Sequence, residues 1–142
     1  MTTLRRSIRT IAPPAKVFPY LADFANAAQW DSGTVSCERV SGDGGPGTVY
    51  RNVSRFAGRE VELLYTTESA EEPTFVVVGR NETTVSRDTI VVTAEGTGSR
   101  VDYTAEFTFT GIARFLGPVM RPLLDRLGDQ TAEQLARTLD RL

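Results

Sequence analysis

The strict alternation of apolar and polar residues over positions 100–109 is the sequence feature that most constrains the fold. Even positions carry a charge or a hydroxyl, and odd positions are apolar or aromatic, namely Val101, Tyr103, Ala105, Phe107 and Phe109. One buried and one solvent-exposed face is typical of a strand in an antiparallel sheet. After Gly111 the apolar residues recur at spacings of three and four instead, which predicts a long helix with one apolar stripe.

Further strands are expected between the N-terminus and this region. Runs of β-branched and aromatic residues alternate with glycine, proline and asparagine turns about every ten residues, which is typical of an antiparallel meander. Pro13-Pro14 end the first run, and the apolar spacing that follows predicts a short helix over 14–23 and a helical turn over 26–29. The expected strands, the first of them at a sheet edge, are 4–11, 35–40, 48–56, 59–69, 75–80, 85–94 and 100–110.

We therefore expect an α+β fold in which a curved antiparallel sheet of about six or seven strands wraps around a long C-terminal helix, with one or two short helices after the first strand. A helix of about 20 residues spans roughly 30 Å, which is the width of such a domain. The 142 residues, with 40% hydrophobic and 24% charged side chains, suit one globular domain over 1–142.

Particular segments occupy characteristic places in this order of elements; they are 11–18, 21–24, Trp30-Asp31, 45–50, 56–60, 98–103 and Gly111. In the order of its elements and in these segments, the chain resembles the START-like helix-grip superfamily, also called SRPBCC. The resemblance is greatest to its polyketide cyclase/dehydrase and lipid-transport branch. The matching segments cover nearly the whole chain and are mostly structural.

The resemblance implies a deep, mostly apolar cavity between the concave face of the sheet and the long helix. In that superfamily such a cavity holds lipids, sterols, polyketides or other hydrophobic molecules. Some members are aromatase/cyclases and others are carriers, so the fold alone does not select a function.

The chain contains no histidine and one cysteine, Cys37. Histidine-dependent hydrolases, His-ligated metal sites, CxxC redox pairs and intramolecular disulfides are therefore excluded. Sixteen basic and eighteen acidic residues give a net charge of −2, which lacks the basic surface typical of a nucleic-acid-binding protein. We expect no cofactor and no metal, and any catalysis would depend on Tyr, Asp, Glu, Arg or water.

The N-terminal segment MTTLRRSIRT lacks the apolar core of a signal peptide. No apolar run approaches the roughly 20 residues that span a bilayer. We expect a cytoplasmic protein, monomeric or homodimeric, without an integral membrane segment. The expected partner is a small hydrophobic molecule and not a nucleic acid.

Residues on the predicted interior faces are candidate ligand-binding residues. Most are apolar or aromatic, and core packing is the alternative for each of them. Trp30 could pack the short helices onto the sheet, and a buried tyrosine could make an internal hydrogen bond. The candidates are Trp30, Tyr50, Leu63, Tyr65, Val77, Ile90, Tyr103, Phe107, Phe115, Met120 and Leu124.

Tyr65, Tyr103 and Asp88 are candidate catalytic residues. A tyrosine can act as a general acid, and burial of Asp88 beside Ile90 would raise its pKa into the range used for acid–base chemistry. The alternative for Asp88 is a strand end that faces water. The alternative for the tyrosines is core packing.

Arg51 is the fourth candidate catalytic residue. If its face of strand 48–56 is concave, Arg51 could polarise a ligand carbonyl or pair with a carboxylate. If that face is convex, Arg51 is a solvated charge, and Tyr50, Asn52 and Phe56 point inward instead. The alternation within this strand is compatible with both.

Residues 42–47 match the pattern G-x-G-x-x-G. A dinucleotide site requires a helix to begin at the third glycine, whereas here a strand is expected, and Pro46 removes one N–H donor. A loop between two strands is the preferred interpretation.

Three functions follow from these observations. The first is binding of a small hydrophobic or amphipathic ligand, of lipid, polyketide or aromatic type, in the cavity. The second is a metal-free polyketide cyclase/dehydratase, which requires at least two of the catalytic candidates to converge on one pocket. The third is a non-catalytic interaction module with a collapsed interior.

Overall fold

Seven antiparallel strands form one sheet in the computed structural model, which describes residues 1–142 apart from the side chains of Ile112 and Leu116. The strand order is β1-β7-β6-β5-β4-β3-β2, so the first strand lies at an edge, as expected. Each strand begins and ends within two residues of the predicted position. The strands are β1 (Thr2–Thr10), β2 (Thr34–Ser41), β3 (Val49–Phe56), β4 (Arg59–Glu71), β5 (Thr74–Arg80), β6 (Thr84–Glu95) and β7 (Gly98–Phe109).

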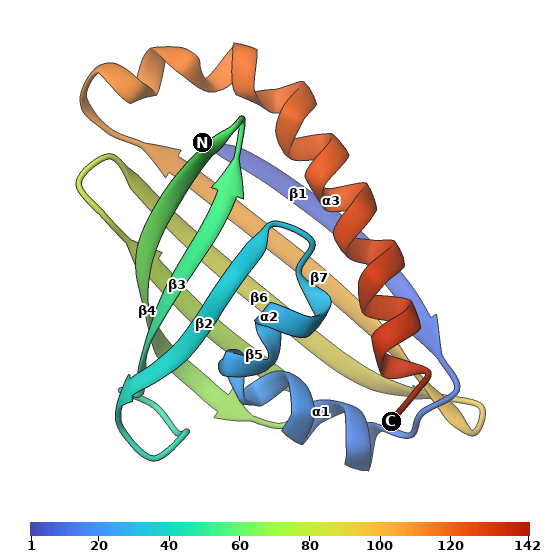
Figure 1. The fold of residues 1–142 in the computed structure, drawn as a ribbon. Coiled ribbons are helices and arrows are strands. Elements are labelled where there is room, and N and C mark those ends of the chain that lie inside the picture. Colours follow the sequence, from blue (N-terminus) through green and yellow to red (C-terminus); the bar gives the residue numbers. More distant parts are fainter.

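Short helices follow β1, and a long helix ends the chain (Figure 1). Pro14 occupies the first turn of the first helix, where its missing N–H costs no hydrogen bond. The predicted α+β helix-grip architecture is therefore confirmed. The helices are α1 (Pro14–Ala22), the 3₁₀ turn η1 (Phe24–Asn26), α2 (Ala27–Trp30), the 3₁₀ segment η2 (Gly111–Leu116) and α3 (Gly117–Leu139).

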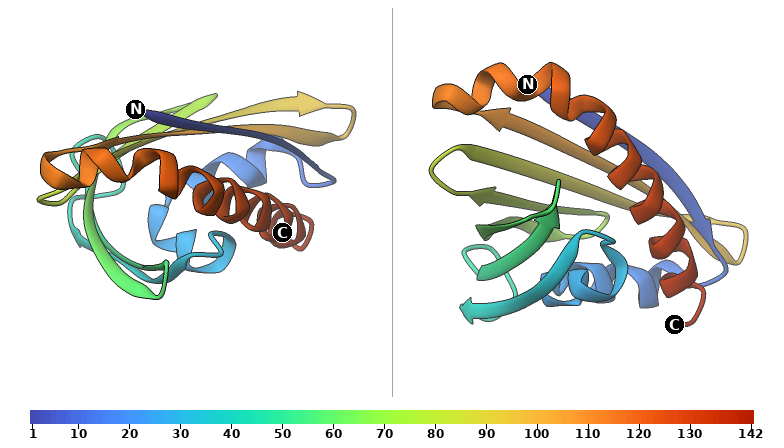
Figure 2. Two further views of the ribbon diagram at one scale, coloured as in Figure 1. Left: turned by 90° about the horizontal axis from the view of Figure 1, so that it is seen from above. Right: turned by 45° about the horizontal axis from the view of Figure 1, so that its top comes forward.

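The sheet is strongly curved, and α3 lies along its concave side (Figure 2). Register shifts occur within 34–36 and 39–41 of β2 and within 67–69 of β4. Such bulges bend a strand and increase its twist, which accounts for the way β2, β3 and β4 turn away from the plane of β1, β6 and β7. The two-residue turn Ala57-Gly58 joins β3 to β4, with φ of 53° and 78°, as expected of a tight hairpin.

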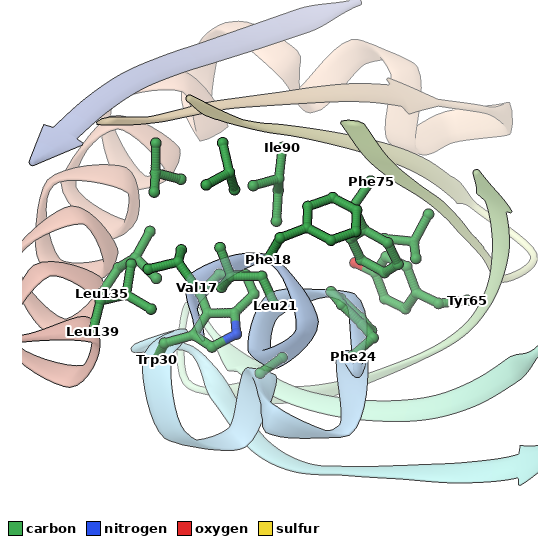
Figure 3. Close-up of a cluster of buried hydrophobic side chains, with 14 of the residues drawn as sticks. Val17, Phe18, Leu21, Phe24, Trp30, Tyr65, Phe75, Ile90, Leu135 and Leu139 are labelled. Atoms are coloured by element: carbon green, nitrogen blue, oxygen red, sulfur yellow. The ribbon is translucent and has the colours of Figure 1, made fainter. Parts of the chain in front are cut away.

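The larger hydrophobic core fills the end of the molecule that α1 and α2 cover. Side chains from the short helices point at the sheet and at the C-terminal half of α3, and the largest of them are almost completely buried (Figure 3). Members of this core include Val17, Phe18, Leu21, Phe24, Trp30, Phe75, Ile90, Leu135 and Leu139.

A second, smaller core cluster lies near the start of α3. It is formed by Leu4, Ala105 and Leu124, with partly buried aromatic residues around it. Tyr103 packs against both clusters. The site described below lies between the sheet and α3, and residues of both clusters line it.

Polar contacts hold α3 against β1. Arg6 Nε donates to Asp129 Oδ1 at 3.0 Å, and Arg6 Nη2 donates to the carbonyl oxygen of Asp125 at 3.1 Å. At the other end, Thr10 Oγ1 donates to Asp140 Oδ1 at 2.6 Å. A Cβ on Gly128 would lie 3.1 Å from Arg6 Nη2, so a glycine at that position leaves room for the guanidinium.

Among the described residues, no helix combines the length and the apolar character needed to cross a membrane.

Candidate ligand-binding cavity

A cavity of about 150 Å³ lies between the concave face of the sheet and α3. Side chains from β1, β3, β4, β6, β7 and α3 line it, and most of them are apolar. Cavities of this size and apolar character bind a molecule as large as a benzene ring.

Five of the eleven candidate ligand-binding residues line this cavity. They share the inward parity of their strands or lie on the inner stripe of α3, which is the property that the sequence pattern detects. These residues are Leu63, Tyr65, Tyr103, Phe107 and Met120.

Four other candidates lie in the packed core instead: Trp30, Tyr50, Val77 and Ile90. They face inward, but side chains of α1, η1 and α2 fill the space in front of them. The ring of Trp30, for example, meets Phe24 edge-on at a centroid distance of 6.3 Å. Trp30 therefore packs the short helices onto the sheet, which is the alternative to ligand binding that the sequence suggests for this residue.

The last two candidates lie near the start of α3 but outside the cavity wall. Phe115 is 68% exposed on η2, and the guanidinium of Arg114 lies 4.7 Å from the centre of its ring. Leu124 packs with Leu4 and Ala105 in the second core cluster. Phe115 was misplaced because η2 precedes α3 and has a different pitch. Leu124 lies on the apolar stripe of α3, and that stripe alone does not separate packed positions from cavity-lining ones.

Asp88 lies in the interior of the cavity wall and is only 4% exposed. Tyr103 Oη donates to Asp88 Oδ2 at 2.6 Å, and Ser86 Oγ donates to Asp88 Oδ1 at 3.0 Å. Burial raises the pKa of Asp88 to about 6, and the two hydrogen bonds limit that rise. The alternative of a solvent-exposed strand end is therefore wrong for this residue.

Tyr65 and Tyr103 lie beside Asp88 in the same wall. Burial, followed by the charge of Asp88, raises the pKa of both phenols well above the ordinary value. Tyr65 lies across Gly79 of the neighbouring strand, where a Cβ would come within 2.7 Å of its ring. Three of the four candidate catalytic residues thus converge on one cavity.

Arg51, the fourth, lies on the convex face of the sheet. It is exposed, and it forms ion pairs with Glu38 at 3.0 Å and with Glu62 at 3.1 Å. Tyr50 and Asn52 are buried, so the even positions of β3 point inward. The catalytic interpretation of Arg51 is contradicted, because its partners are surface carboxylates on β2 and β4.

Asp31 is a second carboxylate in the cavity wall. It accepts hydrogen bonds from Thr34 Oγ1 at 2.7 Å, from Thr131 Oγ1 at 2.9 Å and from the backbone N–H of Gly33 at 3.4 Å. These bonds fix the turn after α2 and attach it to α3. Thr131 is not among the sequence candidates, although it lies on the inner stripe of α3.

Ser86 is a further wall residue that sequence reasoning missed. Ser86 lies at alternate positions with Asp88 and Ile90 on β6, so its side chain points to the same inner face. This alternation could have identified it from the sequence.

Cys37 is half-buried, and burial raises the pKa of its thiol to about 11, which disfavours the nucleophilic thiolate. Within the part of the chain that the structure describes, no three His, Cys, Asp or Glu side chains are grouped as metal ligands.

The glycine-rich segment 42–47 is a loop between β2 and β3. Gly42, Gly44 and Gly47 have φ between 90° and 102°. Since a strand follows the third glycine, no helix N-terminus is available to hold a pyrophosphate, and the interpretation as a loop is confirmed.

A curved seven-stranded antiparallel sheet that grips a C-terminal helix defines a START-like, or SRPBCC, protein. A family model described as "Polyketide cyclase / dehydrase and lipid transport" matches residues 1–140. The chain belongs to this polyketide cyclase/dehydrase and lipid transport family. No curated protein sequence matches the chain significantly.

Several solved structures share the fold across almost the whole chain. TTHA0849 from Thermus thermophilus is 24% identical, with a TM-score of 0.79 over 99% of this chain and 95% of that one. The Zhui aromatase/cyclase from Streptomyces sp. R1128 is 12% identical, with a TM-score of 0.82 over 99% and 94%. A START superfamily protein from Mycobacterium smegmatis is 15% identical, with a TM-score of 0.75 over 98% and 94%. These identities establish the fold alone.

Proposed function

We propose that this protein binds a small, largely apolar molecule in the cavity between the sheet and α3. The observation that supports this most directly is the distribution of the wall residues. Apolar side chains such as Leu63, Phe107 and Met120 form most of the wall, and hydrogen-bonded polar groups gather around Asp88 and around Asp31. This is the usual composition of a small-molecule site, in which apolar area supplies affinity and a few polar groups fix orientation.

The size of the cavity is compatible with useful affinity. A one-ring ligand that buries about 250 Å² of apolar surface gains roughly 6 kcal/mol, part of which is offset by lost translational and rotational freedom. Affinities in the micromolar to millimolar range follow without any special residue. In the proposed setting, residues 1–142 act as one ligand-binding domain in the cytoplasm, as a monomer or homodimer and without a cofactor.

Isothermal titration calorimetry with propylbenzene tests the proposal, because this ligand has no polar group. Ala132→Leu would fill the cavity from α3, since Ala132 lines it, and should weaken binding about tenfold or more. Ala136→Leu is the matched control, because Ala136 lies one turn further along the same helix and outside the wall. Equal binding by the two variants would contradict the proposal, and so would a native protein that binds neither propylbenzene nor any of its polar analogues.

A cyclase or dehydratase is the second candidate function, and the convergence of Asp88, Tyr65 and Tyr103 on one cavity favours it. Asp88 could take a proton from a carbon flanked by two carbonyls, and that carbon then attacks the carbon of a third carbonyl group while a tyrosine donates a proton to its oxygen. Water would then leave from the resulting alcohol, with protonated Asp88 giving its proton to the departing hydroxyl and the tyrosinate taking the neighbouring C–H proton. A non-catalytic interaction module is less well supported, because it requires a collapsed interior.

The enzymatic candidate is tested with a short poly-β-ketone thioester, followed by mass spectrometry for loss of one water molecule. Catalysis by this group predicts that Asp88→Asn lowers the rate about 10²-fold or more. A rate that equals the rate without protein would exclude the enzyme and leave the binding function untouched.

A further inference from the structure

We infer that the molecule bound in this cavity presents a hydrogen-bond donor, such as a phenolic or enolic hydroxyl or an amide N–H, to Asp88, and that the cavity discriminates against carboxylates. This inference rests on the proposed binding function and deepens it by naming the chemical class of the ligand.

Asp88 has acceptor capacity that its protein partners do not use. A carboxylate has about four acceptor positions, and Asp88 uses one on each oxygen, for Tyr103 and for Ser86. Asp31 in the same wall already accepts from Thr34, Thr131 and the backbone of Gly33. Asp88 is therefore the wall carboxylate with more capacity to accept a hydrogen bond from a ligand.

The charge of the wall disfavours an anionic ligand. Asp31 and Asp88 are both acidic, and among the ion pairs of the described residues none includes Asp88. The wall also contains two arginines. The guanidinium of Arg6 is bound to Asp129 and to the carbonyl of Asp125, and Arg55 is an exposed residue paired with Glu60 at 3.5 Å. A carboxylate ligand placed at Asp88 would thus meet two like charges, while both arginines of the described wall already have carboxylate partners.

The burial of Asp88 has an energetic cost that a ligand donor would reduce. A buried carboxylate without a cation is unfavourable, and two neutral hydroxyl donors compensate for that cost only in part. A ligand donor would supply a third hydrogen bond to the carboxylate. A ligand with a donor therefore reduces the free-energy cost of burying the Asp88 carboxylate. An apolar or anionic ligand would leave that cost unchanged.

The register of β6 and β7 indicates the length of the ligand. Asp88 lies opposite Ala105, and Thr84 lies opposite Phe109 at the other end of the cavity wall. Four residues of a strand span about 13 Å. A ring with a hydroxyl at one end and a short alkyl chain at the other fits this distance, with its hydroxyl toward Asp88 and its chain toward Phe109 and Met120.

Five ligands of similar shape test the inference by calorimetry on the native protein at pH 8. 4-Propylphenol and 4-propylbenzamide carry a donor, 4-propylbenzoate carries a negative charge in place of the amide, and propylbenzene and 4-propylanisole carry neither donor nor charge. We expect the phenol to bind about tenfold tighter than propylbenzene and anisole, and the amide to bind at least about tenfold tighter than the benzoate.

Asp88→Asn is the variant that separates recognition from shape, because asparagine preserves the size of the side chain and removes its charge. In this variant the benzoate should approach the amide in affinity, and the preference for the phenol over propylbenzene should fall several-fold. Should the variant not fold, the amide–benzoate comparison in the native protein still decides the question.

The two proposals fail in different ways. Equal affinities for all five ligands, or a benzoate that binds as tightly as the amide, would overturn the donor inference while leaving the binding function intact. No binding of any of the five, propylbenzene included, would overturn both.

Discussion

Tyr103 Oη donates a 2.6 Å hydrogen bond to Asp88 Oδ2 inside a cavity whose other walls are mainly apolar. The two residues come from neighbouring strands, and both line the cavity together with Ala105, which lies opposite Asp88. The pair therefore remains at the surface of the cavity and is not enclosed in the core. This relationship links the fold to the proposed function, since it supplies a buried polar end to an apolar site.

Removal of the phenol should raise the pKa of Asp88 further. The hydrogen bond from Tyr103 lowers that pKa, which burial has raised to about 6. In Tyr103→Phe the carboxylate keeps its burial and loses this donor, so its titration midpoint should move to higher pH. Carbon-13 NMR of labelled aspartate measures this midpoint. An unchanged or lower midpoint would show that the hydrogen bond from Tyr103 does not stabilise the ionised form of Asp88.

Asp88 should also make stability depend on pH. Because its folded-state pKa is raised from 3.8 to about 6, its favourable contribution is fully present below pH 3.8 and is lost as the pH rises through 6. The free energy of unfolding of the native protein, relative to that of Asp88→Asn, should therefore fall by about 3 kcal/mol between about pH 3 and about pH 7. Urea unfolding at several pH values measures the difference, and a flat difference would contradict the raised pKa.

Gly79→Ala should destabilise the protein by about 1–3 kcal/mol, because the added Cβ would lie 2.7 Å from the ring of Tyr65. Tyr65 is buried between Phe24 and the cavity and has little room to move. Gly117→Ala is the control, since a Cβ there meets nothing within 4 Å. Equal melting temperatures for the two variants would show that Tyr65 does not need the space above Gly79.

Arg51→Ala should leave ligand binding unchanged. Arg51 faces solvent, and its ion pairs with Glu38 and Glu62 are exposed, so their loss should cost less than about 1 kcal/mol of stability. Calorimetry with propylbenzene and a thermal melt check both statements. A large loss of affinity would place Arg51 in the site and would reverse the assignment of the faces of β3.

The strands and helices can be predicted from local sequence patterns. Burial of one face makes apolar residues recur every two positions in a strand and about every 3.6 positions in a helix. The alternation over 100–109 therefore predicted which face of β7 is inside, and the leucine spacing predicted α3. The sequence of β3 does not reveal which of its faces points inward, because both faces carry a valine or an aromatic residue. The contacts with the neighbouring strands were needed to assign the faces. The carboxylates of Glu38 and Glu62, on adjacent strands, decide that Arg51 faces outward.

The site was less predictable than the fold, because a cavity is a property of distant parts of the chain. Trp30 and Ile90 face inward as expected, yet the packing of α1 and α2 determines that they meet side chains and not a void. The bond between Asp31 and Thr131 joins residues 100 positions apart, and no local pattern reports it. For Asp88, parity indicated the interior, but only its place in a wall shared with residues of β1, β4 and α3 shows that it borders a space.

An NMR titration of the labelled protein with 4-propylphenol, followed by intermolecular NOE measurements, tests most directly whether the cavity is the binding site. Binding there predicts contacts from the ring protons to Tyr103, Ala105 and Leu63, with the propyl group near Phe109 and Met120. Absence of these contacts, or shifts confined to residues on the convex face of the sheet, would contradict the claim that the ligand occupies the cavity.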